Sequence, residues 1–249
     1  KRQPPFQIDK VLEGGAIGVI EESNSSKFNV GDYVMSNFGW REYFVSDDNS
    51  LNVINPEFGP LQAYLGTLGM PGLTAYAGLL EVGKLKDGEN VLVSAAAGAV
   101  GSIVCQIALA KGCKVYGTTG TDEKCLWLEK EIGIEKAFNY KKIDNLISEY
   151  RSEIKGGIDV YFDNVGGTHL EAGINILNTG GRIALCGMID QYNDPNIKNG
   201  PSNLIMLIMK NASIEGFIVS KYNHLQEKFL EDMKNWSNSG KLIWKETIL

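Results

Sequence analysis

From about residue 83 to residue 219, short apolar runs alternate along the chain with longer segments of helical periodicity. The first run, residues 89–94, is rich in β-branched residues and lies between Asp87-Gly88 and a stretch of small residues. Apolar residues then recur at helical spacing from Val100 to Ala108, and Lys111-Gly112 supplies a basic last turn and a glycine stop. This alternation is typical of a parallel sheet with helical crossovers.

The same pattern predicts six strands and the helices between them. The strands are expected at residues 89–94, 114–117, 137–140, 158–162, 182–186 and 213–219. The helices are expected at residues 100–108, from 121 onward, and at 143–154, 170–177 and 203–210. Six strands in β-α-β order make a full dinucleotide-binding sheet, so the predicted fold class is α/β, a Rossmann-type doubly wound parallel sheet.

The first eighty residues differ, because they are rich in glycine, asparagine and aromatic residues and lack a long helical period. Residues 14–21, 33–36 and 42–45 are predicted to be short strands of a β-rich unit. Residues 62–80 are predicted to form a helical hinge. We therefore expect a β-rich unit at 1–75, a dinucleotide-binding domain at 76–220, and a return toward the first unit at 221–249.

Composition narrows the function. The 249 residues carry a net charge of -6, which argues against a nucleic-acid partner, and 43% are hydrophobic, enough for a sizeable core. The apolar stretch at 203–209 is far shorter than a membrane span, and no signal-like run follows the first residues, so a soluble, cytoplasmic protein is expected.

Metal chemistry is not expected from the cysteines and histidines. The four cysteines include no C-x-x-C pair, and they are interpreted as core or strand residues in a reducing compartment. The two histidines, His169 and His224, belong to no H-x-x-x-H or H-E pair and are interpreted as helix-surface residues. No metal site is therefore predicted.

The strand at 89–94 leads directly into Ala96-x-Gly98-x-x-Gly101 and then into a helix. Small residues let the backbone approach a pyrophosphate, whose charge is met by N–H groups at the helix start. A lone G-x-x-G is more often a packing or turn device. With a strand before it, a helix after it and further β-α units, it favours a dinucleotide site.

The second strand indicates which dinucleotide is bound. NAD enzymes hold the ribose 2′-hydroxyl with an acidic residue at the end of that strand. Here the strand ends in Tyr116-Gly117-Thr118-Thr119-Gly120, without a carboxylate. Lys124 lies one turn into the next helix, where an ammonium can neutralise a 2′-phosphate, so NADP(H) is predicted; the alternative is that Lys124 is an ordinary solvated lysine.

Several longer motifs carry a family resemblance. They are Gly69-Met70-Pro71-Gly72-Leu73-Thr74-Ala75-Tyr76, Val93 to Gly101, Asp122-Glu123-Lys124, Tyr161-Phe162-Asp163-Asn164-Val165-Gly166-Gly167, and Gly216-Phe217-Ile218-Val219. Over essentially the whole chain they resemble the zinc-independent medium-chain dehydrogenase/reductases, in the group of prostaglandin reductases, leukotriene B4 12-hydroxydehydrogenases and 2-alkenal double-bond reductases. The resemblance implies that the β-rich unit is part of a GroES-like substrate domain.

The resemblance also implies an activity and a set of site residues. The activity is NADPH-dependent reduction of the carbon-carbon double bond of enones and enals, by hydride transfer to the β-carbon. The pyrophosphate would face Gly98, Ala99, Val100 and Gly101. The 2′-phosphate side would face Lys124 and Tyr140, and the nucleotide would face Asn164. The nicotinamide half would face Cys186, Gly187, Met188, Ile189, Asp190, Gln191, Tyr192, Phe217, Ile218 and Val219.

Hydride transfer to a conjugated double bond leaves enolate charge on the carbonyl oxygen, which a hydrogen-bond donor stabilises. Tyr192 is the candidate for that donor or for a ribose-side relay; the alternative is that it only packs against the cofactor. Asn164, Tyr140 and Phe217 have equivalent alternatives as turn or core residues.

The chain also departs from the resembled group. Its relatives begin earlier and extend further, so terminal segments are expected to be missing, and substrate-pocket residues from those parts are unassigned. Asp190 replaces a frequent serine, and Met209 replaces the tyrosine of the prostaglandin-active members, so prostaglandin specificity is not expected. A quinone reductase and a non-catalytic NADPH-binding protein remain alternatives. The resemblance implies a homodimer acting on a small enone or enal.

Overall fold

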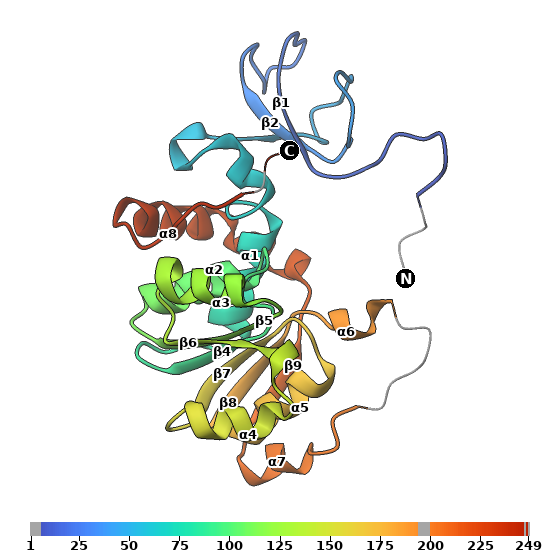
Figure 1. The fold of residues 1–249 in the computed structure, drawn as a ribbon. Helices are drawn as coiled ribbons and strands as arrows, with labels where there is room; N and C mark the ends of the chain where they lie inside the picture. Colours follow the sequence, from blue (N-terminus) through green and yellow to red (C-terminus); the bar gives the residue numbers. More distant parts are fainter. Residues whose placement is uncertain (1–5, 194–199, 247, 249) are drawn as a thin grey trace.

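The computed structural model describes residues 6–193, 200–246 and 248, and it contains two sheets joined by helices (Figure 1). The larger sheet has six strands in the order β6-β5-β4-β7-β8-β9, and every neighbouring pair is parallel. Its strands are β4 (Asn90–Val93), β5 (Lys114–Thr119), β6 (Lys136–Asn139), β7 (Ile158–Asp163), β8 (Leu177–Leu185) and β9 (Ser213–Gly216). The predicted Rossmann-type doubly wound sheet is confirmed.

Helical segments connect these strands. They are α2 (Gly101–Ala110), α3 (Asp122–Trp127) with its extension η4 (Leu128–Ile132), η5 (Tyr140–Lys142), α4 (Leu146–Glu153), α5 (Gly167–Ile176), α6 (Ile189–Tyr192) and α7 (Ile205–Met209). The chain runs from β4 outward through β5 to β6, then returns to the other side of β4 and runs through β7 and β8 to β9. The strand order therefore reverses between β4 and β7.

Alternate residues of each strand enter different halves of the core. In β4, Val91 and Val93 join the cluster beneath α1 and α2, while Leu92 joins the cluster beneath α4 and α5. In β7, Phe162 enters the first cluster and Tyr161 the second. A parallel sheet covered on both faces needs apolar residues at consecutive positions, which explains the unbroken hydrophobic runs in the sequence.

The first part of the chain forms a small antiparallel sheet of β1 (Ala16–Val19), β2 (Tyr33–Ser36) and β3 (Asn52–Val53). The strand predicted at residues 42–45 is wrong. Those residues are irregular, and the side chain of Val45 is 97% exposed. An alternating run becomes a strand only when another strand completes its hydrogen-bond ladder, and no described strand pairs with this segment.

Helical turns join the two sheets, as predicted for residues 62–80. They are η1 (Pro56–Phe58), η2 (Leu61–Leu65), α1 (Met70–Ala77) and η3 (Gly78–Val82). After β9, η6 (Val219–Leu225) leads into α8 (Gln226–Asn238), a helix that the sequence pattern did not predict. Phe229 of α8 is buried against Tyr76 of α1, whose hydroxyl donates to the Asp232 carboxylate at 2.6 Å. The division of the chain at residues 75 and 220 stays a prediction.

Two other predictions need correction at the second half of the sheet. β9 ends at Gly216, not at Val219: the Phe217 N–H makes the last contact with β8, at 3.4 Å from the Leu185 carbonyl, and Val219 already begins η6. The helix expected at residues 203–210 is a single short segment, α7. Over the described residues, no helix is long and apolar enough to cross a membrane.

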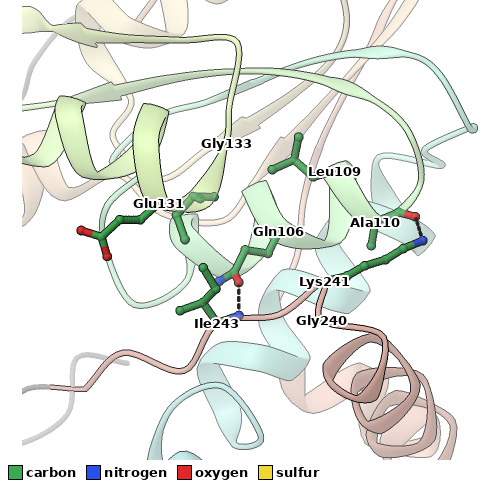
Figure 2. A pocket seen from close by; sticks show the side chains of 9 residues that line it. Gln106, Leu109, Ala110, Glu131, Gly133, Gly240, Lys241 and Ile243 are labelled. Atoms are coloured by element: carbon green, nitrogen blue, oxygen red, sulfur yellow. Dashed lines mark hydrogen bonds between the residues drawn. The ribbon is translucent and has the colours of Figure 1, made fainter.

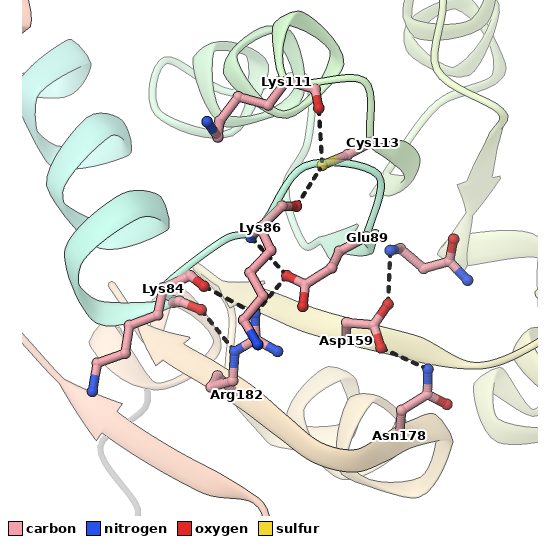
Figure 3. A network of polar contacts seen from close by, with 10 residues as sticks. Lys84, Lys86, Glu89, Lys111, Cys113, Asp159, Asn178 and Arg182 are labelled. Carbon is pink, nitrogen blue, oxygen red and sulfur yellow. Dashed lines mark hydrogen bonds and ion pairs between the residues drawn. The ribbon is translucent and has the colours of Figure 1, made fainter.

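Polar side chains join the amino ends of the strands (Figure 3). The Arg182 guanidinium on β8 pairs with the Glu89 carboxylate at 2.5 Å and donates to the carbonyls of Gly83 and Lys84. On β7, the Asp159 carboxylate accepts from the backbone N–H of Asn90 and from the Asn178 side chain. These contacts tie β4, β7 and β8 together at one edge of the sheet.

Candidate functional site

The opposite edge, at the carboxyl ends of the strands, holds most of the residues predicted to bind a cofactor. The connection after β4 leads to α2, which packs on one face of the sheet, while the connection after β7 leads to α5, which packs on the other. Open α/β sheets bind ligands where neighbouring connections diverge in this way. The residues at this edge therefore decide what the site can hold.

Close backbone packing shapes the loop between β4 and α2. Ala95 has a positive φ of 49°, and the Ala96 N–H donates to the Thr118 carbonyl of β5 at 2.8 Å. A Cβ atom added at Gly101 would lie 2.3 Å from the Ala95 carbonyl oxygen, an overlap that no side chain tolerates. A Cβ atom at Gly117 would lie 2.6 Å from that of Ala96. Small residues are thus required here by the protein's own packing.

The loop delivers backbone donors to the start of α2. No side chain caps this helix, and within the described residues the N–H groups of Ala99, Val100 and Gly101 have no hydrogen-bond acceptor. Gly98 and Ala99 are exposed to solvent. A ten-residue helix that begins with uncapped amides at an exposed loop has the geometry to bind an anion such as a pyrophosphate.

Gly120 follows directly after β5, at the position where NAD enzymes place a carboxylate. A Cβ atom added there would lie 3.3 Å from the Tyr140 hydroxyl and 3.4 Å from Cε of Lys141. Lys124 lies exposed on α3, whose N-cap Thr121 accepts a hydrogen bond from the Lys124 N–H. The surroundings of Gly120 are therefore phenolic and cationic.

Asp163, the last residue of β7, is fully buried and binds four donors. Its carboxylate accepts hydrogen bonds from the hydroxyls of Ser94 and Tyr161, both at 2.7 Å, and from the backbone N–H groups of Val165 and Gly166. Asn164 extends this network, because its backbone N–H donates to the Ser94 hydroxyl and its side chain to the Ser94 carbonyl. The network connects the end of β4 to the turn before α5.

Burial controls the ionisable groups around Asp163. Burial, together with the Asp163 charge, raises the pKa of Tyr161 well above 10, so the phenol stays protonated and donates. Burial lowers the pKa of His169, while Asp163 and Asp190 act in the opposite direction. His169 is 5% exposed, and its Nδ1 lies 3.4 Å from the Thr118 hydroxyl, so the prediction of a helix-surface histidine is wrong. His169 sits on the inward face of α5, which the spacing of histidines did not reveal.

The segment after β8 folds back over Asp163. The N–H groups of Cys186 and Gly187 both donate to the Asp163 carbonyl. The Tyr192 hydroxyl accepts a hydrogen bond from the Met188 N–H at 3.2 Å, and its own proton is left to donate. Tyr192 lies on α6 and is 61% exposed. Burial raises the pKa of Cys186 to about 12, so its thiol is not a nucleophile at neutral pH.

Phe217 lies beyond β9, where it packs edge-on against Phe162 of β7. The hinge approaches this pair closely, because a Cβ atom at Gly78 would lie 2.3 Å from Phe217 Cζ. Ile218 is exposed, whereas Phe217 and Val219 are half-buried. Phe217 thus connects the carboxyl edge with the hinge between the two sheets.

A hollow of about 270 Å³ lies elsewhere, between the second half of α2 and the segment after α8 (Figure 2). There the Ile243 N–H donates to Gln106 Oε1 and the Lys241 ammonium donates to the Ala110 carbonyl. None of the predicted site residues lines it. Over the described residues, no group of three or more His, Cys, Asp or Glu side chains is placed to hold a metal ion.

Family models and relatives agree with this architecture. A model described as zinc-binding dehydrogenase matches residues 99–235, and one described as N-terminal domain of oxidoreductase matches residues 1–54. Prostaglandin reductase 1 of Rattus norvegicus is 45% identical over 242 residues, which cover 95% of this chain and 73% of that protein. The chain belongs to the zinc-independent medium-chain dehydrogenase/reductases.

Two further relatives carry cofactor names. The NADP(+)-dependent 2-alkenal reductase of Nicotiana tabacum is 42% identical over 244 residues, which cover 98% of this chain and 71% of that protein. The crystal structure of CurA in complex with NADPH from Vibrio vulnificus has a TM-score of 0.89 and 37% identity, covering 100% of this chain and 75% of that one. The chain is an NADP(H)-dependent oxidoreductase of this family, as its sequence predicts.

The structure places all the predicted site residues at or beyond the carboxyl ends of the strands. Three residues with consequences there received no role from the sequence: Ser94, Asp163 and Lys141. Ser94 and Asp163 lie inside two of the motifs that carry the family resemblance, Val93 to Gly101 and Tyr161 to Gly167. Lys141 follows Tyr140 directly, so the basic pair Lys141-Lys142 was the signal that could have found it.

Proposed function

We propose that this chain reduces the carbon-carbon double bond of α,β-unsaturated aldehydes and ketones with NADPH. The observation that carries the proposal is the carboxyl edge of the sheet, where uncapped amides, a carboxylate-free strand end and an exposed tyrosine follow one another from β4 to β8. The names of the prostaglandin reductase and 2-alkenal reductase relatives support this substrate class.

The residues at this edge fit the cofactor. Gly98, Ala99, Val100 and Gly101 would hold the pyrophosphate, because the N–H groups of Ala99, Val100 and Gly101 have no acceptor among the described residues. Lys124 and Tyr140 would face the 2′-phosphate, and Asn164 the nucleotide below β7. The nicotinamide half would face residues 186–192 and 217–219. NADPH bound there supplies the hydride.

Tyr192 would act on the substrate carbonyl. Its hydroxyl oxygen already accepts the Met188 N–H, which orients the phenol and leaves its proton to point at a carbonyl oxygen. Such a donor stabilises the negative charge that develops on that oxygen. Cys186, beside it, is held as a neutral thiol by burial, so it does not compete as a nucleophile for an electrophilic enal.

The test is a reaction of the protein with NADPH and, in turn, a 2-alkenal, an enone and a quinone, followed by product analysis. We expect a saturated aldehyde or ketone whose carbonyl is intact. Formation of an allylic alcohol would contradict the proposal, and exclusive turnover of the quinone would assign the chain to quinone reduction. Tight NADPH binding without turnover of any acceptor would indicate a non-catalytic binding protein.

Replacement of Tyr192 by phenylalanine tests its role as donor. We predict that Tyr192→Phe lowers kcat for an enone by about tenfold or more, because charge on the substrate oxygen loses its donor. The dissociation constant for NADPH and the free energy of unfolding should stay close to those of the unsubstituted protein, since Tyr192 is exposed. An unchanged kcat would show that Tyr192 only packs against the cofactor.

We further propose a homodimer formed through β9. Over the described residues this strand is the last in the sheet, and the segments before and after it carry exposed apolar side chains: Leu204, Ile205, Ile208 and Met209 on or beside α7, and Ile218 after the strand, are 49 to 78% exposed. An open edge beside apolar residues favours pairing with a second copy about a two-fold axis. Cytoplasmic location stays a prediction.

Light scattering during size-exclusion chromatography measures the mass of the particle and so tests the dimer. Ile208→Glu should convert a two-chain particle into a single chain, because Ile208 is 78% exposed on α7, the segment that precedes β9. Val45→Glu, the same kind of change at a site that is 97% exposed in the first part of the chain, should leave the mass unchanged. A single chain before any substitution would overturn the proposed dimer.

A further inference from the structure

The ends of β5 and β6 bring together more positive charge than one lysine. Three lysines follow these strands: Lys124 on α3, and Lys141 and Lys142 on η5. The Lys142 ammonium forms an ion pair with the Asp122 carboxylate, which also accepts from the Asn139 side chain. Within the described residues neither Lys124 nor Lys141 forms an ion pair. Their charge is thus available for an anion.

The register of the sheet aims Lys141 at Gly120. Thr119 of β5 lies opposite Asn139 of β6 in the parallel ladder, so Gly120 and Tyr140 are the next residues on each strand. The Asn139 side chain then accepts the Lys141 N–H at 3.2 Å, which turns the chain back toward β5. Cε of Lys141 ends 3.4 Å from the position of a Gly120 Cβ, and its ammonium is one bond further.

We propose that Lys141 is a second cation for the 2′-phosphate, beside Lys124, and a determinant of the preference for NADP(H) over NAD(H). The proposal rests on the proposed function, because it places the adenosine ribose beside Gly120. A phosphate monoester carries between one and two negative charges near neutral pH, so a single ammonium leaves part of its charge unmatched. The Tyr140 hydroxyl and Cε of Lys141 lie 3.3 and 3.4 Å from the position of a Gly120 Cβ, so a phosphate bound beside Gly120 would contact both side chains.

Direct binding of ligands with and without the 2′-phosphate tests the proposal, and it needs no turnover. Lys141→Ala should weaken NADPH and adenosine 2′,5′-bisphosphate by about tenfold, the effect of one charge-assisted hydrogen bond, and leave NADH and adenosine 5′-monophosphate within about twofold. Lys141→Arg should retain most of the affinity for NADPH. The loss in Lys141→Ala should shrink at high salt, because the Lys141 side chain is exposed to solvent and its charge is screened.

Lys114→Ala is the matched control. Lys114 is exposed and begins β5, so its replacement removes the same charge from the opposite end of the same strand. It should leave the affinity for all four ligands unchanged. Equal losses of NADPH and NADH in Lys141→Ala, or equal losses of NADPH in the two variants, would overturn the proposal.

Binding of NADPH and NADH to the unsubstituted protein distinguishes a failure of the proposed 2′-phosphate site from a failure of the proposed role of Lys141. If it binds NADPH no better than NADH, the proposed placement of the 2′-phosphate fails and Lys141 has no role there. If it prefers NADPH and Lys141→Ala keeps that preference, only the inference about Lys141 fails. Lys124→Ala measured alongside then shows whether one cation carries the whole preference.

Discussion

The two edges of the large sheet use polar side chains in different ways. At the amino edge, polar side chains bind across neighbouring strands: the Arg182 guanidinium pairs with the Glu89 carboxylate, and the Asp159 carboxylate accepts from the Asn90 backbone N–H and the Asn178 side chain (Figure 3). At the carboxyl edge, the buried Asp163 carboxylate binds hydroxyls and backbone N–H groups of the two connecting turns. The first arrangement joins strands, and the second shapes loops.

The difference supports the carboxyl edge as the place of the proposed cofactor site. Side chains that satisfy each other across the amino edge leave few donors for a ligand. At the carboxyl edge, Asp163 and Ser94 bind each other and the turn before α5, and the amides of Ala99 to Gly101 at the start of α2 have no acceptor among the described residues. The absence of a Cβ atom lets the backbone pack closely against Ala95 at Gly101, and against Tyr140 and Lys141 at Gly120.

The largest loss in the free energy of unfolding should come from Asp163→Ala. This change leaves the hydroxyls of Ser94 and Tyr161 and two backbone N–H groups buried without their acceptor, and we expect a loss of about 3 to 5 kcal/mol in the free energy of unfolding. Urea titration measures it. Asp163→Asn, which keeps the shape and one acceptor oxygen, should lose less. Equal stability of all three proteins would contradict the role of Asp163.

Arg182→Met should give the next largest loss of stability and should leave NADPH binding unchanged. It breaks the half-buried pair with Glu89 and the bonds to two carbonyls, so we expect a loss of about 2 to 3 kcal/mol in the free energy of unfolding. The dissociation constant for NADPH, measured by calorimetry on the folded variant, should not change, because Arg182 lies at the edge away from the site. A large loss of NADPH affinity would erase the distinction between the edges.

Gly101→Ala should act mainly on the ligand. The added methyl would lie 2.3 Å from the Ala95 carbonyl oxygen, so the loop must shift. We expect about tenfold or more loss of NADPH affinity and about 1 to 3 kcal/mol of stability. Gly112→Ala, at an exposed glycine with open space and a positive φ beyond the far end of α2, is a control for backbone strain alone. It should spare NADPH binding.

The smallest effect should come from His169→Gln, which should change only the pH dependence of the free energy of unfolding. Because burial lowers the pKa of His169 below its ordinary value of 6.5, the unfolded chain binds more protons than the folded one as the pH falls. Its contribution to stability is therefore complete above that value and is lost as the pH falls through it, by at most about 1.4 kcal/mol per pH unit. His169→Gln should show a shallower decline from about pH 7.5 to about pH 5.5. An identical decline would show that His169 does not titrate on unfolding.

The comparison also shows where sequence reasoning succeeded. Strands such as β4 and β7 were predictable because a sheet covered on both faces demands continuous apolar runs, and the turn at Gly98 to Gly101 was predictable because few residue types fit it. It failed at residues 42–45 and at His169. A strand needs a partner, and the burial of a histidine depends on which face of α5 turns inward; neither property is local.

The sequence alone thus determined that Ala95 to Gly101 form a tight loop at the start of a helix, because a strand precedes this run of small residues and a helix follows it. The sequence alone also shows that no carboxylate directly follows β5. Only the tertiary structure decided that Asp163 binds Ser94, the residue before this loop, and that Lys141 lies beside Gly120. Asp163 and Ser94 lie far apart in the sequence, and Lys141 and Gly120 follow adjacent strands. The order and register of the strands bring each pair together, and no local sequence pattern encodes either property.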